Sequence, residues 1–160
     1  MQSSRSHSIR EAQPNEASAL SELAFRSKAH WGYSPAFMEA CRDELTIKPS
    51  QLGTENYQCF VAVDGDLILG YYSLEDQTQG VYELDALFVD PPYIGAGVGR
   101  SLIQHALQNL AERGAMRLII QGDPHAVSFY EAAGAEQIGT RPSGSMPGRD
   151  LPLFEIAIRN

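Results

Sequence analysis

VDPPYIGAGVGRSL, residues 89–102, connects an apolar strand to the start of a helix through a glycine-rich turn. Gly95, Gly97 and Gly99 remove side chains at positions where the backbone can approach a ligand closely. At a helix N-terminus the backbone N–H groups are exposed and the helix dipole is positive, so the turn favours an anion such as a pyrophosphate. Taken alone, the pattern is equally compatible with a loop that only turns the chain.

Two well-known glycine motifs do not fit this stretch. Its Gly-x-Gly-x-Gly spacing differs from the Gly-x-Gly-x-x-Gly of a dinucleotide-binding turn, and it lies past the middle of the chain. The strand predicted next, residues 117–121, does not end in the acid that would bind a ribose. A P-loop is excluded because Gly99 is followed by Arg100 and Ser101 instead of Lys and Ser or Thr.

A second motif, DPHAVSFYEAAGA at residues 123–135, follows the first. In their order and approximate separation, the two segments resemble the GNAT superfamily of acyl-CoA-dependent N-acetyltransferases. The family pattern of Arg or Gln, two residues, Gly, one residue, and Gly or Ala falls on residues 94–99, with Ile94 as a departure. Phe129, Tyr130 and Gly134 match the later pattern. The resemblance covers residues 81–135 well, and the flanks only by the order of elements.

This resemblance implies acetyl-CoA as a cosubstrate. In the family, the strand before the loop pairs with the pantetheine arm, and backbone amides hold the pyrophosphate. Ile94 therefore weakens one contact without removing the site. The residues implied to bind CoA are Leu87, Phe88, Val89, Gly95, Ala96, Gly97, Val98, Gly99, Arg100, Ser101, His125 and Phe129.

Tyr130 aligns with the family tyrosine near the CoA sulfur, where a phenol can return a proton to the departing thiolate. The alternative is a core aromatic residue packed beside Phe129. Alternation along residues 83–89 places Glu83 and Asp85 on the same strand face as the side chains at 87 and 89. We expect Glu83, or in second place Asp85, to be the general base, directly or through water. Either carboxylate could instead bind the acceptor ammonium or be purely structural.

Residues 26–35, RSKAHWGYSP, join two predicted helices where family members build the acceptor pocket. Lys28, His30, Trp31 and Tyr33 are the predicted acceptor-binding residues, because an aromatic face over an ammonium contributes about 0.5–2 kcal/mol. Packing at the helix junction explains the two aromatic side chains equally well. The arginines at 141 and 149 could instead bind a carboxylate on the acceptor.

Composition narrows the class of protein. A chain of 160 residues with 43% hydrophobic content predicts one domain over residues 9–160, preceded by a flexible tail at 1–8. The absence of an apolar run of about 20 residues, and of an apolar signal-peptide core, predicts a cytoplasmic protein without a membrane segment. The net charge of −8 argues against nucleic acid as a partner, and it favours a cationic amine or simply maintains solubility. Cys41 and Cys59 are expected as free thiols.

The histidines at 7, 30, 105 and 125 lack the spacing of metal ligands, so no metal is predicted. Asp123, His125 and Ser128 are the residue types of a hydrolase triad. They lie within two helical turns, where the serine and histidine cannot reach one another with a third group orienting the base, so a serine hydrolase is excluded.

Periodicity and turn signals predict the elements. Helices are expected over residues 14–26, from 35, over 98–113 and from 124 to 134. Strands are expected near 9 and over 57–63, 67–74, 82–89, 117–121, 136–141 and 151–159. The fold class is α/β (α+β), with a GNAT-like mixed, mostly antiparallel sheet of about six to seven strands and about four helices. The family resemblance adds a splay between the central strand and the next.

Together these observations predict an enzyme that moves an acetyl group from acetyl-CoA to a primary amine of a small molecule or peptide by direct attack. The alternative is a noncatalytic acyl-CoA-binding regulatory module, which Ile94 and the two uncertain strand carboxylates leave open. A homodimer is compatible with the sequence.

Overall fold

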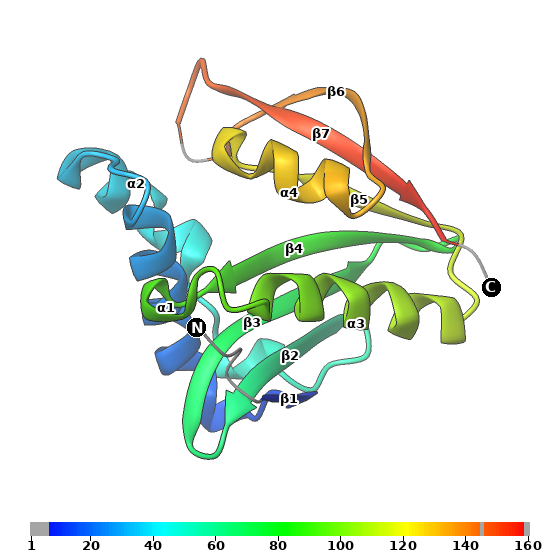
Figure 1. The fold of residues 1–160 in the computed structure, drawn as a ribbon. Coiled ribbons are helices and arrows are strands. Elements are labelled where there is room, and N and C mark those ends of the chain that lie inside the picture. The colour runs from blue at the N-terminus through cyan, green and yellow to red at the C-terminus, as the bar shows by residue number, and fades with distance from the viewer. Residues whose placement is uncertain (1–6, 145, 159–160) are drawn as a thin grey trace.

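The computed structural model describes residues 7–158 except Ser145, and within them one seven-stranded sheet runs in the order β1-β2-β3-β4-β5-β7-β6 (Figure 1). Its strands are β1 Ser8–Glu11, β2 Tyr57–Asp64, β3 Leu67–Asp76, β4 Val81–Val89, β5 Arg117–Gln121, β6 Glu136–Pro142 and β7 Asp150–Ala157. The helices are α1 Ala17–Ala29, α2 Pro35–Leu45, α3 Val98–Glu112 and α4 Val127–Ala132. Short 3-10 turns are η1 Pro14–Glu16, η2 Pro49–Gln51, η3 Pro91–Tyr93 and η4 Pro124–Ala126. The predicted mixed, mostly antiparallel sheet with four helices is confirmed.

Local sequence signals explain several element boundaries. The β2–β3 hairpin turns at Gly65, whose φ of +60° suits glycine, and Asp64 pairs with Leu67 on either side of the turn. Helix α2 begins where the sequence predicts, because Ser34 accepts a hydrogen bond from the Phe37 backbone and a proline occupies the first helical position.

Two apolar cores cover opposite faces of the sheet. Helix α1 packs on one face, where Leu20 and Leu23 meet Val61 and Tyr71. Helices α3 and α4 pack on the other face, against a core that includes Tyr72 and the buried stripe of α3. None of the helices in the described ranges is long and apolar enough to cross a membrane.

The central strands β4 and β5 separate partway along their length (Figure 1). Their parallel pairing runs only from Val81 opposite Arg117 to Leu84 opposite Ile120. Beyond that point β4 continues beside β3, and β5 continues beside β7. The predicted splay is therefore present, and within the described ranges no strand pairs with the second half of β4 on the β5 side.

A β-bulge lies where the splay begins. Ser73 of β3 pairs with Ala86, but the next residue, Leu74, pairs with Leu84, so Asp85 is an extra residue on β4. A bulge of this kind shifts the alternation of side chains by one position and re-aims the residue that it contains.

The bulge overturns the predicted alternation of residues 83–89. Leu84, Leu87 and Val89 all contribute to the core beneath α3, which strict alternation would not allow. The side chains of Leu87 and Val89 therefore lie on the face opposite Glu83, not on the same face. The sequence pattern carries no signal for the extra residue.

Smaller differences concern the ends of elements. Ser8 belongs to β1 and not to the predicted tail, while residues 1–6 and Arg159 of the last predicted strand lie outside the described residues. On α2, Met38 and Cys41 are the buried residues. Both cysteines are buried free thiols.

Candidate active site

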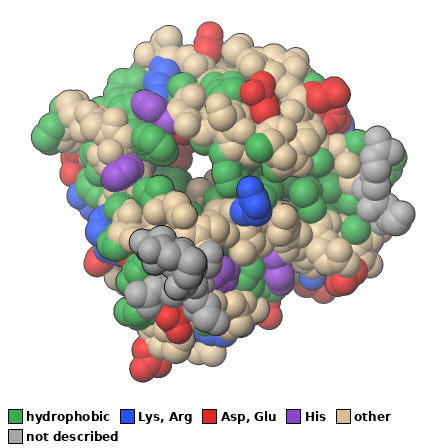
Figure 2. All heavy atoms as spheres, viewed as in Figure 1, with side chains coloured by type: hydrophobic (Ala, Val, Ile, Leu, Met, Phe, Trp, Pro, Cys, Tyr) green, Lys and Arg blue, Asp and Glu red, His purple; other side chains and the backbone are tan. Residues whose placement is uncertain are grey.

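A cavity of about 1190 Å³ occupies the splay and continues past the glycine-rich turn on one side and the end of α2 on the other. Its walls come from β4, from the turn at residues 93–97, from the end of α1 and from η4 and α4. Figure 2 shows an opening near the middle of the molecule, with hydrophobic side chains around it. The space between the separated strands is therefore a cavity and is not filled by packed side chains.

The glycine-rich turn has the geometry of an anion cradle. Gly95 and Gly97 have φ angles of +89° and +85°, and a Cβ atom built on either would meet nothing within 4 Å. Gly97 is the N-cap of α3 and offers no side chain to the first turn. The N–H groups of Val98, Gly99 and Arg100 have no acceptor within the helix, so they are available to an anion.

Gly99 has a different reason to be glycine. A Cβ atom there would lie 3.2 Å from the Phe129 ring, so the absence of a side chain lets α3 and α4 approach one another. Ile94 is 46% exposed beside the turn. Of the residues predicted to bind CoA, all but Val98 and Ser101 line the cavity. Val98 is buried in the core, and the Ser101 N–H closes the first helical turn on Gly97.

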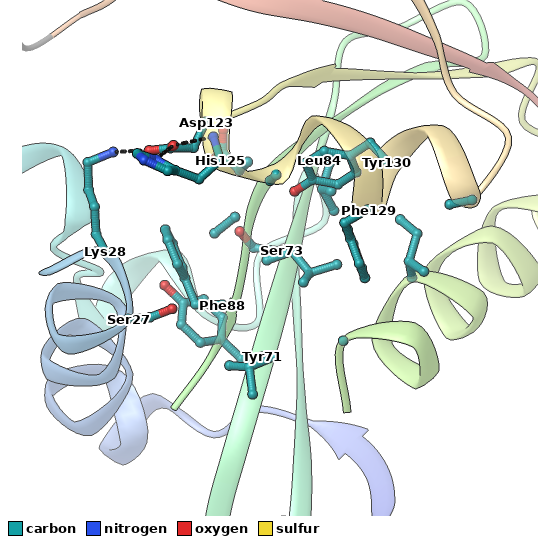
Figure 3. A pocket seen from close by; sticks show the side chains of 18 of the residues that line it. Ser27, Lys28, Tyr71, Ser73, Leu84, Phe88, Asp123, His125, Phe129 and Tyr130 are labelled. Atoms are coloured by element: carbon teal, nitrogen blue, oxygen red, sulfur yellow. Dashed lines mark hydrogen bonds and ion pairs between the residues drawn. The ribbon is translucent and has the colours of Figure 1, made fainter. Parts of the chain in front are cut away.

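Tyr130 lies on α4, and its hydroxyl points into the cavity (Figure 3). The ring is 7% exposed and packs edge-on against Phe129 at 5.2 Å. It also lies close to Gly122, where a Cβ atom would be 3.3 Å from the ring. Burial, with a smaller effect of the Asp123 charge, raises the pKa of Tyr130, so the hydroxyl stays protonated.

The two strand carboxylates occupy different surroundings. Glu83 accepts a hydrogen bond of 2.9 Å from the Arg141 guanidinium of β6, so its charge is paired. Asp85 is exposed to the cavity, although the surrounding protein still removes part of its solvent, and no ion pair involving it is found among the described residues. Burial, followed by the charges of Glu75, Glu83 and Glu44, raises the pKa of Asp85 to about 6.

Ser73 adds a polar group to the same wall. The side chain is fully buried, and its Oγ has no hydrogen-bond partner among the described residues. The Tyr57 hydroxyl lies near it without the geometry of a hydrogen bond. An unpaired buried hydroxyl costs free energy unless a ligand or water meets it, so Ser73 points to an occupant of the cavity.

The α1–α2 junction meets the loop after β5 at the mouth of the cavity. Lys28 donates to Asp123 at 3.2 Å, and the Tyr33 hydroxyl donates to the same carboxylate at 2.8 Å. The Trp31 and His125 rings stack with centroids 4.9 Å apart and planes at 6°. We call these five residues the clasp. Arg149, on the loop between β6 and β7, donates to the Tyr33 hydroxyl oxygen at 2.9 Å and extends the clasp to a third segment.

The clasp has a strongly ionised centre. Burial by itself would raise the pKa of Asp123, but hydrogen bonds from His125 and Tyr33 and the Lys28 charge outweigh it and hold this pKa at about 2. Burial and the neighbouring carboxylate raise the pKa of Tyr33 to about 12. Tyr33 therefore remains a proton donor to Asp123.

The structure separates the four predicted acceptor-binding residues. Lys28 and Trp31 line the cavity, whereas Tyr33 lies behind them within the clasp. His30 is exposed, touches Trp31 edge-on at 5.6 Å, and does not line the cavity. Sequence reasoning missed the role of Asp123 as the common partner of Lys28 and Tyr33, because no sequence pattern links residues so far apart in the chain. Within the described ranges no cluster of side chains could hold a metal ion.

Comparison with known proteins places this geometry in a family. Residues 31–143 match the model of a GNAT acetyltransferase domain. The chain is 31% identical over 127 residues to the peptidyl-lysine N-acetyltransferase YiaC of Escherichia coli, covering 79% of this chain and 81% of that protein. It is 33% identical over 99 residues to YjaB of the same organism, also named a peptidyl-lysine N-acetyltransferase, covering 61% of this chain and 62% of that protein.

Of the first two curated relatives that it matches, the chain spans 25% of the length of one and 62% of the length of the other. Among solved structures, the PaiA N-acetyltransferase of Thermoplasma acidophilum in complex with coenzyme A superimposes with a TM-score of 0.75 at 20% identity. That superposition covers 96% of this chain and 99% of the other. At this identity the superposition shows a shared fold.

Proposed function

Because this chain belongs to the GNAT acetyltransferase family, we propose that it transfers an acetyl group from acetyl-CoA to a primary amine by direct attack. The observation that carries the proposal is the glycine-rich turn, which opens a helix N-terminus into the same cavity that Tyr130 and Asp85 face. An anion cradle, a proton donor and a carboxylate that can attract an ammonium thus share one space.

The residues present fit CoA. The open turn at Gly95 and Gly97 leaves room for a pyrophosphate, and the first-turn N–H groups of α3 would hold it. Arg100 lies exposed at the start of the same helix, where its charge would add to theirs. The free edge of β4 after Leu84 supplies backbone groups for an extended arm of the ligand. Bound there, acetyl-CoA supplies an activated acyl group and a thiolate leaving group.

The chain's own residues would then handle protons and charge. Tyr130 would give a proton to the departing sulfur, because its hydroxyl is protonated and points into the cavity. Asp85 would attract the acceptor ammonium, because its carboxylate faces the cavity without an ion-pair partner among the described residues. Glu83 as general base stays a prediction, and its ion pair with Arg141 is the feature that weighs against it.

The acceptor we propose is an amine on a small molecule or peptide. The two Escherichia coli relatives carry the name peptidyl-lysine N-acetyltransferase, which supports an alkyl amine such as a lysine side chain. The net charge of −8 and Asp85, for which the described part of the chain offers no ion-pair partner, also favour a cationic acceptor. Cytoplasmic location and a homodimer remain expectations from the sequence.

The second candidate is a noncatalytic acyl-CoA-binding regulatory module, and one observation favours it: Ile94 is exposed beside the cradle where the family has Arg or Gln. The deciding experiment incubates the protein with acetyl-CoA and a panel of amines, including a lysine peptide, and measures thiol release beside a binding titration of CoA. Thiol release that depends on the amine supports the enzyme. Tight CoA binding without release for any amine supports the module.

A further inference from the structure

We infer that His125 is the proton acceptor for the attacking amine and that Asp123 is its positioning residue. The inference rests on the proposed acetyl transfer. The His125 imidazole lines the cavity that Tyr130 also faces. Asp123 holds one edge of this ring by a hydrogen bond, and the Trp31 indole stacks on its face.

Asp123 fixes which ring nitrogen of His125 carries the proton. Its Oδ1 lies 2.8 Å from Nδ1 and also accepts the His125 backbone N–H at 2.9 Å. Because Asp123 stays ionised, the neutral imidazole is expected to place its proton on Nδ1. No hydrogen bond to Nε2 is found among the described residues, so the lone pair on that nitrogen is free to accept a proton.

Trp31 fixes the plane of the ring. The two rings lie parallel, which holds the imidazole against the α1 side of the cavity mouth (Figure 3 shows His125 beside Asp123 and Lys28). The charged and titratable groups facing the dyad are Lys28, Tyr33 and, through Tyr33, Arg149.

The proposed step moves the acyl group from sulfur to nitrogen. An N–H bond of the acceptor ammonium breaks, and its proton goes to Nε2 of His125. The nitrogen lone pair forms a bond to the acyl carbon as the carbon–sulfur bond breaks. The thiolate takes a proton from Tyr130, which regains one from the new amide nitrogen, and His125 releases its proton to water. Imidazole suits this task because it exchanges protons near neutral pH.

The first test is the pH dependence of kcat/KM for the amine. For wild type, kcat/KM should fall at low pH as one group is protonated. H125Q should lower kcat/KM at neutral pH by about 10²- to 10³-fold and recover partly at high pH, where the amine deprotonates unaided. The matched control is H105Q, because His105 hydrogen-bonds Tyr72 and does not line the cavity. It should keep the wild-type profile.

A second test does not need activity. Trp31 is the only tryptophan of the chain, and a stacked imidazolium quenches indole fluorescence. Wild-type fluorescence should therefore fall as His125 is protonated, H125Q should abolish the change, and H30Q should keep it, because His30 meets the indole only edge-on. Nitrogen NMR should find the proton of neutral His125 on Nδ1, and D123N should move it to Nε2.

The outcomes separate the inference from the function on which it rests. An active protein in which H125Q keeps the wild-type rate and pH profile, or in which E83Q alone removes the fall at low pH, overturns the role of His125 while the acetyltransferase stands. Fluorescence insensitive to H125Q, or neutral His125 protonated on Nε2, also overturns it. A protein that shows the quenching but acetylates no amine overturns both proposals.

Discussion

Lys28 at the end of α1 and Asp123 after β5 are 95 residues apart in the sequence, and they form an ion pair of 3.2 Å across the mouth of the splay. The last turn of α1 also holds the other side of the splay, because Arg26 donates two hydrogen bonds to Asp90, directly after β4. One helix end thus fixes the distance between two strands that no longer pair with one another.

Removing the charge of Asp123 should destabilise the fold in a pH-dependent way. The pKa of this carboxyl is lowered to about 2 in the folded chain, so its stabilisation is present above the ordinary value near 4 and is lost as pH falls towards 2. Asp123→Asn should lower the free energy of unfolding at pH 7 by about 2 kcal/mol. Denaturant titrations should show the difference shrinking between pH 4 and pH 2. A difference that stays constant over this range would contradict the assigned role.

The anion cradle predicts a charge effect at Gly97. An aspartate there would face the pyrophosphate, so Gly97→Asp should abolish the thermal stabilisation by acetyl-CoA, which at 100 times the dissociation constant is about 2.7 kcal/mol for wild type. Gly97→Asn is the matched control, because asparagine tolerates the same positive φ without adding charge. If both variants lose binding equally, backbone strain and not charge is responsible.

Tyr130→Phe tests the proton donor. The substitution keeps the packing against Phe129 and removes only the hydroxyl that points into the cavity. We expect kcat to fall by about 10- to 1,000-fold while the affinity for acetyl-CoA changes little. Calorimetric titration with CoA and steady-state rates measure the two separately. Unchanged kcat in a reaction limited by chemistry would leave Tyr130 as a packing residue.

The ionised Asp85 carboxylate, which the proposed function requires, should lower the stability of the folded chain. Its folded pKa is raised to about 6, so the folded chain loses stability as pH rises from about 4 to 6 and the carboxylate ionises. Because the Asp85 side chain is exposed to solvent, which weakens the effect, Asp85→Asn should raise Tm at pH 7 by only about 2 °C, with no gain at pH 4. It should also raise KM for the amine. Glu83→Gln, which breaks the pair with Arg141, should show no such gain in Tm.

Much of the fold follows from local signals in the chain. Ser34 and Pro35 predict the start of α2, Asp64-Gly65-Asp66 predicts the hairpin, and residues 117–121 read as a strand with the bounds that β5 has. These signals act over a few residues, where turn chemistry and periodicity decide the conformation.

The features that sequence reasoning did not provide depend on tertiary structure. The extra residue Asp85 belongs to the pairing of β3 with β4, and alternation along β4 alone cannot reveal it. The pairing of Glu83 with Arg141 and of Asp123 with Lys28 joins segments distant in the chain. The glycine-rich turn and Tyr130 could be proposed from the sequence because each lies within a short motif of fixed spacing.

The clasp also sets when the site can form during synthesis. Tyr33 and Arg149 are 116 residues apart, and their hydrogen bond closes a loop that contains most of the chain. Contacts of such high sequence separation form late in folding. The intervening chain must lose conformational entropy before the contacts contribute any stabilising free energy. The ribosome must release the chain through Arg149 before the cavity mouth is complete, so shorter nascent chains are expected to lack an assembled site even where the first hairpin has folded.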